Sequence, residues 1–131
     1  MIETIKIRIL LSTLWVVIML NMLYIDVLSQ NIPGSDEEML AFAGDTPISQ
    51  LMFFAAIMIE IPILMVLLSQ VLAWGIGRWV NIGAAVLMIA FVVGPEIGNT
   101  AVYPHYLFMG TFEVLCMVGV ILVSWRSADG K

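Results

Sequence analysis

Four long apolar runs, separated by short polar or glycine-containing stretches, dominate the hydropathy pattern of the chain. The runs cover residues 9–28, 47–74, 78–95 and 104–124. Each is close to or above the roughly 20 residues that an α-helix needs to cross the hydrocarbon core of a bilayer. The pattern therefore predicts an all-α polytopic membrane protein, with a single domain built as an antiparallel four-helix transmembrane bundle.

The polar stretch between the first two runs predicts one further, shorter helix. Residues Ser35 to Glu38 have the Ser-x-x-Glu form of a capping box, and Gly44 fits a helix end. We expect a short interfacial helix in the first outer loop, with its acidic side chains towards water and its apolar side towards the bundle.

Local signals also predict where the spans begin and end. We expect Asp45 or Thr46 to cap the second span, with Pro47 at its first helical position. Residues 75–77, Gly-Ile-Gly, predict a tight turn, after which the third span starts at Arg78.

The start of the chain is basic and then apolar, as in a signal peptide. The first apolar run could therefore be either a cleaved signal peptide or a retained membrane span. The apolar run is too long for a signal peptide, and no small-x-small cleavage site follows it. Asn21 and Asp26 also interrupt the run. We therefore expect a retained first span.

Composition agrees with a membrane protein and removes several functional classes. The chain is 62% apolar and 11% charged, whereas soluble domains are about 45–50% apolar and about 25% charged. Five Lys and Arg residues make nucleic acid an unlikely partner. Cys116 is the only cysteine, which excludes an intrachain disulfide, a Cys-x-x-Cys redox pair and a multi-thiolate metal site. We expect no cofactor and no metal.

The basic residues predict the orientation of the spans. All of them fall on one side of a four-span arrangement: Lys6, Arg8, Arg78, Arg126 and Lys131. The two loops on the other side carry acidic residues instead. The positive-inside rule therefore places both termini of this multi-pass protein in the cytoplasm.

Polar side chains on three different spans lie at a similar depth if each helix rises about 1.5 Å per residue. These side chains are Asn21, Glu60 and Glu113. A carboxylate at the centre of a span costs about 2.5–3.5 kcal/mol on insertion scales. Two carboxyl groups at one depth with no base nearby are not expected to be ionised together. We predict that Glu60 and Glu113 lie close together, sharing a proton or facing a cationic ligand.

A second polar layer lies nearer the outer surface. Its members are Tyr24, Asp26, Glu96, Asn99, Tyr103 and His105. Tyr106 shares a helix face with Glu113, seven residues away, and Pro62 predicts a kink or a polar niche beside Glu60. The residues that we expect to contact a ligand are Asn21, Tyr24, Asp26, Glu60, Glu96, Tyr106 and Glu113.

Three functions fit this pattern. The leading one is an outward-facing acidic pocket that binds a lipophilic or cationic small molecule or relays protons, because acids inside a membrane usually mark function. An isomerase-like enzyme would use one acid as proton donor and the other as base. A structural accessory subunit would instead meet a second copy or a partner subunit through the small residues of the third span, which are Gly83, Ala84, Ala85, Ala90 and Gly94.

Short motifs on three spans resemble the DoxX-like group of small four-span bacterial membrane proteins. They are Leu14-Trp15, the run from Leu20 to Asp26, Glu60-Ile61-Pro62 and Gly77-Arg78. The resemblance implies a four-helix bundle in the bacterial inner membrane and offers no settled activity.

The chain is also similar, more distantly, to the sterol-isomerase and sigma-2-receptor fold. In that family an acid closes the first span, as Asp26 does here, and another lies in the second, as Glu60 does. The similarity implies that these acids line a pocket for amine or sterol ligands. The shorter first loop and the acid Glu113 in the fourth span depart from that family.

Overall fold

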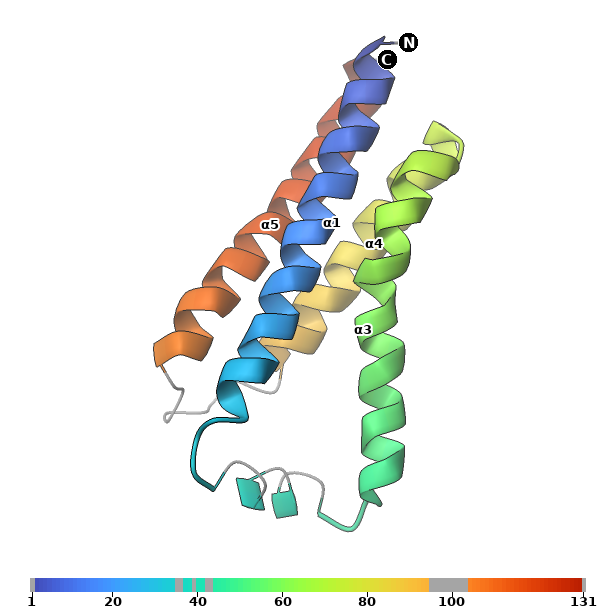
Figure 1. Ribbon diagram of the computed structural model, residues 1–131. Coiled ribbons are helices and arrows are strands. Elements are labelled where there is room, and N and C mark those ends of the chain that lie inside the picture. Colours follow the sequence, from blue (N-terminus) through green and yellow to red (C-terminus); the bar gives the residue numbers. More distant parts are fainter. Residues whose placement is uncertain (1, 35–36, 39, 42–43, 95–103, 131) are drawn as a thin grey trace.

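The chain folds into long helices, as the apolar runs predict. The computed structural model describes residues 2–34, 37–38, 40–41, 44–94 and 104–130, and these residues form no strand. The long helices are α1 (Ile2–Ser29), α3 (Ile48–Val71), α4 (Trp74–Val93) and α5 (Pro104–Gly130) (Figure 1). Each of the four is long and apolar enough to span a membrane, so the chain is an integral membrane protein.

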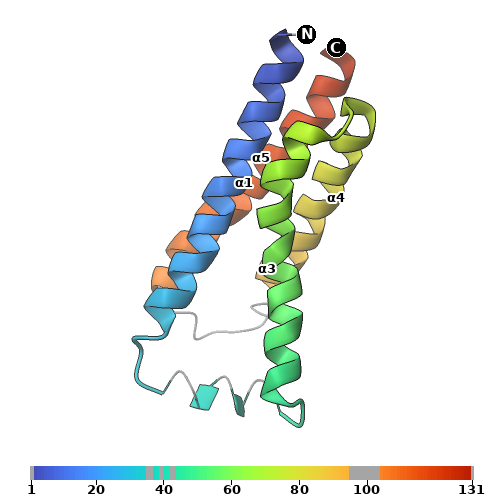
Figure 2. The ribbon, with the colours of Figure 1, turned by 45° about the vertical axis from the view of Figure 1, so that its right-hand side comes forward.

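The helices form an antiparallel bundle with two distinct ends. Helix α1 packs against α3 and α5, and α4 packs against the same two helices, so α3 and α5 stand at opposite corners. The marked N and C ends lie together with the α3–α4 connection, at what we call the terminal end (Figures 1 and 2). Towards the opposite, loop end, α3 leans away from α1.

Each helix buries one narrow stripe of residues spaced by three or four. The stripe of α1 is Leu11, Trp15, Ile18, Met22 and Ile25. The stripe of α3 is Met58, Pro62, Met65 and Ser69, and that of α4 is Gly77, Asn81, Ala85, Met88 and Val92. The stripe of α5 is Gly110, Glu113, Met117, Val120 and Ser124. This spacing is that of helices packed nearly parallel to one another.

The sides of the helices that face away from the bundle are also apolar. Phe53, Val71 and Leu115 are among the large apolar side chains that are at least 60% exposed. In a membrane protein these outward-facing apolar surfaces lie within the bilayer and contact lipid.

The junction between α3 and α4 lies earlier than the Gly-Ile-Gly motif predicts. Leu72 and Ala73 have extended backbones, and Gly75 to Gly77 already belong to the first turn of α4. The Gly77 amide donates to the Ala73 carbonyl at 2.7 Å. A side chain at Gly77 would place its Cβ 3.4 Å from the Cβ of Leu72. Gly77 is therefore a helical residue of α4 in contact with Leu72 and does not form the turn.

The start of α3 also differs from its prediction. Pro47 is the N-cap residue, and no side chain caps the helix, so neither Asp45 nor Thr46 has the expected role. The Pro47 carbonyl instead accepts the amides of Gln50 and Leu51.

The short helix in the first loop is present in the residues described there. Residues 37–38 and 40–41 are helical. Gly44 has the features expected of a helix-ending glycine, a φ of 58° and an amide that donates to the Leu40 carbonyl. Ser35 of the expected capping box lies outside the described residues.

The small residues of the third span do not share one face. Ala85 is fully buried in the bundle, whereas Gly83, Ala90 and Gly94 are exposed. These small residues therefore lie on different sides of α4 and do not form the single packing surface that was expected.

Candidate functional site

Among the residues whose burial the structure describes, Glu113 is the one with a buried carboxyl group. It lies on the buried stripe of α5, nine residues after Pro104, and its side chain is only 2% exposed. Its Oε1 atom has no hydrogen-bond partner among the residues that the structure describes. A buried polar atom without a partner costs about 1–3 kcal/mol, so this position is unfavourable unless another group supplies a hydrogen bond.

Glu60 does not lie beside Glu113, which contradicts the predicted pair. Glu60 is exposed on α3, whereas Glu113 points into the bundle from α5, the helix at the opposite corner. Pro62 and Met58 are buried on the inner stripe of α3, so they form no niche beside Glu60. A mechanism that needs two carboxyl groups at one substrate has no support from these positions.

The remaining predicted residues do not form one site, although one of them, Asp26, is close enough to interact with Glu113. Asn21 donates its side-chain amide to the Val17 carbonyl of its own helix at 2.9 Å. Tyr24 and Asp26 are exposed near the loop end of α1, and Asp26 interacts electrostatically with Glu113. Glu96 lies outside the described residues, as do Asn99 and Tyr103.

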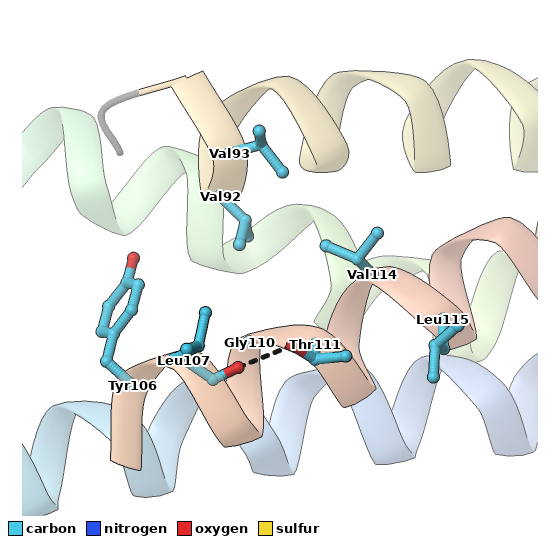
Figure 3. A pocket seen from close by; sticks show the side chains of 8 residues that line it. All are labelled: Val92, Val93, Tyr106, Leu107, Gly110, Thr111, Val114 and Leu115. Atoms are coloured by element: carbon cyan, nitrogen blue, oxygen red, sulfur yellow. Dashed lines mark hydrogen bonds between the residues drawn. The ribbon is translucent and has the colours of Figure 1, made fainter. Parts of the chain in front are cut away.

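Tyr106 lines an apolar groove between α4 and α5 at the loop end. The groove has a volume of about 370 Å³. Its walls are Val92, Val93, Tyr106, Leu107, Gly110, Thr111, Val114 and Leu115 (Figure 3). The Thr111 hydroxyl donates to the Leu107 carbonyl at 2.7 Å, so the groove offers a ligand a mainly hydrocarbon surface.

Gly110 connects the groove with the buried carboxyl group. It lines the groove, is buried, and precedes Glu113 by three residues on the same stripe. A Cβ atom at this glycine would have no other atom within 4 Å. The missing side chain therefore leaves open space at this point of the groove wall, one helical turn from Glu113.

Towards the terminal end, the structure contains a polar cluster that the sequence analysis missed. The Asn81 Oδ1 atom accepts the indole N–H of Trp15 at 2.8 Å and the hydroxyl of Ser69 at 3.1 Å. The Asn81 amide donates to the Gly77 carbonyl at 2.8 Å. One fully buried asparagine thus joins α1, α3 and α4. The available signal was Trp15, because a tryptophan in the middle of a span needs a hydrogen-bond acceptor.

Arg78 forms a second contact at the terminal end. Its Nε atom donates to the Ser124 carbonyl at 3.0 Å, and its guanidinium lies 4.5 Å from the Trp79 ring centroid and 5.4 Å from that of Trp125. The two indole rings meet edge to face, with centroids 6.0 Å apart. The arginine therefore joins α4 to α5 where the chain was expected to meet the membrane surface.

His105 lies at the loop end, as a residue at the start of the fourth span should. Its Nε2 atom is 3.2 Å from the Ser29 hydroxyl oxygen, which links α5 to α1. The described residues contain no group of three His, Cys, Asp or Glu side chains that is placed to hold a metal ion.

These features define a four-helix integral membrane protein in which a buried carboxyl group, that of Glu113, lies close to an apolar groove. The chain belongs to a family of unknown function, DUF6326, whose model matches residues 3–129. No curated protein and no solved structure matches it. The likeness to the DoxX-like group and to the sterol-isomerase fold stays a prediction.

Proposed function

We propose that this protein binds a lipophilic small molecule that carries an amine or another hydrogen-bond-donating group. The α4–α5 groove takes the apolar body of the ligand, and Glu113, reached past Gly110, takes its polar group. The observation that carries this proposal is the Glu113 Oε1 atom, which is buried and has no partner among the described residues.

The dimensions and chemistry of the groove support this kind of ligand. Small-molecule sites are typically concave, about 300–1,000 Å³ in volume, mostly apolar, and equipped with a few polar groups that orient the ligand. A groove of about 370 Å³ between Val92 and Val114 falls at the lower end of this range. A donor on the ligand would satisfy the carboxyl group, and this gain would favour amines and alcohols over carboxylates.

The membrane and the orientation are part of the proposal. We place the protein in a bacterial inner membrane with both termini in the cytoplasm. In support, α1 begins near Lys6 and Arg8 at the terminal end, where Arg78 and Arg126 also lie. In this orientation the groove opens in the outer half of the membrane.

The test uses three probes with one apolar skeleton and different polar groups. They are 1-adamantylamine, 1-adamantanol and 1-adamantanecarboxylic acid, added to the purified protein in lipid nanodiscs while thermal unfolding is followed. We expect the amine to raise the midpoint most, the alcohol less, and the carboxylate least. Glu113→Gln should remove the preference for the amine over the alcohol.

Gly110→Leu should abolish stabilisation by all three probes, because the new side chain fills the groove. Gly83→Leu is the matched control, since Gly83 is an exposed helical glycine with no atom near its missing Cβ. Probes that stabilise Gly110→Leu as well as the parent would show that the groove is not the binding site. An unchanged amine preference in Glu113→Gln would remove Glu113 from the proposal.

A further inference from the structure

Glu60 presents a carboxyl group to the lipid near the middle of a membrane-spanning helix. It lies twelve residues after the start of α3 and eleven before its end. At about 1.5 Å per residue it is roughly 17 Å from either end of the helix. Its side chain is exposed, outside the bundle. A carboxyl group at this depth is unfavourable in contact with lipid alone.

Three other polar side chains on the outer sides of the spans are satisfied within their own helices. Thr13 donates to the Ile9 carbonyl at 2.8 Å, and Thr111 donates to that of Leu107 at 2.7 Å. Asn21, which is partly exposed, bonds to its own helix in the same way. Glu60 has no hydrogen bond within the part of the chain that the structure describes, so its carboxyl group is open to a partner from another molecule.

The residues around Glu60 form a second regular stripe on the outer side of α3. Its members are Phe53, Ile57, Glu60, Leu64, Leu67 and Val71, all of them exposed. We call this set the Glu60 stripe. Its alternating spacing of four and three residues is that of a helix that packs along another helix. In such a stripe one central polar residue can fix both the register and the number of helices.

We propose that the Glu60 stripe is an interface between two copies of this chain, with the two Glu60 side chains hydrogen-bonded to each other. A two-fold axis that runs alongside α3, parallel to the helix, would place Glu60 of one copy opposite Glu60 of the other. A carboxyl pair that holds a proton supplies both donor and acceptor, so it is self-complementary. A second copy therefore satisfies Glu60 without a basic residue from another protein.

This interface is independent of the proposed ligand site. The Glu60 stripe lies on α3, whereas the groove and Glu113 involve α5 at the opposite corner of the bundle. Two copies joined through α3 leave both grooves open, so failure of one proposal does not entail failure of the other.

Disulfide cross-linking tests the interface in a Cys116→Ala background, which removes the only native cysteine. Each test variant carries one cysteine, in place of either Ile57 or Leu64, which lie on either side of Glu60. The two control variants carry one cysteine in place of Val86 on α4 or Leu115 on α5. All four native side chains are at least 50% exposed. The purified proteins are reconstituted at high lipid excess and oxidised with copper phenanthroline. We expect cross-linked dimers at positions 57 and 64 and not at the controls.

Substitutions of Glu60 then test the role of its carboxyl group. Glu60→Gln should keep the dimer, because an amide also donates and accepts. Glu60→Leu should weaken dimerisation by about three- to eight-fold, the effect of one or two hydrogen bonds between membrane helices. Cross-linking at positions 57 and 64 no greater than at the controls would overturn the interface. Equal dimerisation of Glu60→Leu and the parent would overturn the carboxyl pair.

Discussion

Replacing Asn81 with leucine removes the acceptor that joins α1, α3 and α4, and we expect it to destabilise the bundle by about 2–3 kcal/mol. Two hydrogen bonds between helices are lost, those from Trp15 and Ser69. At about 0.6 kcal/mol each in a membrane, they account for about 1 kcal/mol. The Trp15 indole N–H then stays buried without a partner, which adds at least about 1 kcal/mol.

A double-mutant cycle separates this hydrogen bond from a general loss of packing. Trp15→Phe removes the indole donor, so Asn81→Leu should cost less in that background, with a coupling energy of about 1 kcal/mol. Ser69 should couple less strongly to Asn81. Its freed hydroxyl can donate to a carbonyl of its own helix, as Thr13 does.

The assay is unfolding by sodium dodecyl sulfate in mixed micelles, followed by circular dichroism because the tryptophan content changes. Thr13→Val is the control, since the Thr13 hydroxyl bonds only within its own helix and its loss should cost less than about 0.5 kcal/mol. An Asn81→Leu variant as stable as this control, or strictly additive effects in the cycle, would refute the reasoning.

Two further predictions concern the terminal end. Arg78→Lys should destabilise the protein by about 1 kcal/mol in the same titration. An ammonium group cannot both donate to the Ser124 carbonyl and stack on two indole rings, as the guanidinium does. Arg126→Lys is the control, and equal stability of the two variants would contradict the assigned contacts. Green fluorescent protein fused after Lys131 should fluoresce and alkaline phosphatase at the same site should be inactive, whereas an active phosphatase would reverse the proposed orientation.

The number of long helices could be predicted from the sequence, because a long apolar run inside a bilayer has few alternatives to a helical backbone. A run of about 20 apolar residues must satisfy its backbone internally, and a helix does so within one segment. The same argument does not fix where a helix begins. The Gly75–Gly77 motif predicts a turn, yet the extended residues are Leu72 and Ala73, and the two glycines lie inside the first turn of α4.

The rotation of each helix about its own axis could not be predicted from hydropathy. In a soluble bundle polar residues mark the outer face, but in a membrane both faces are apolar. Depth alone therefore placed Glu60 and Glu113 together, although one points to lipid and the other into the bundle. The groove was missed for a related reason, since it depends on how α4 and α5 separate around Gly110 and not on any single residue.

The polar contacts of α3 are concentrated in its last two turns, and this asymmetry bears on both proposals. Ser12 donates to the Val66 carbonyl at 2.8 Å, Gln70 donates to the Ser12 hydroxyl at 3.0 Å, and Ser69 bonds to Asn81. Among the described residues, no side-chain hydrogen bond ties the preceding length of α3 to another helix. Polar contacts therefore hold α3 at the terminal end, whereas its loop half packs against the bundle through apolar side chains such as Met58. The outer side of α3 is left to lipid or, as proposed, to a second copy, so Glu60 and Glu113 are proposed to have different partners.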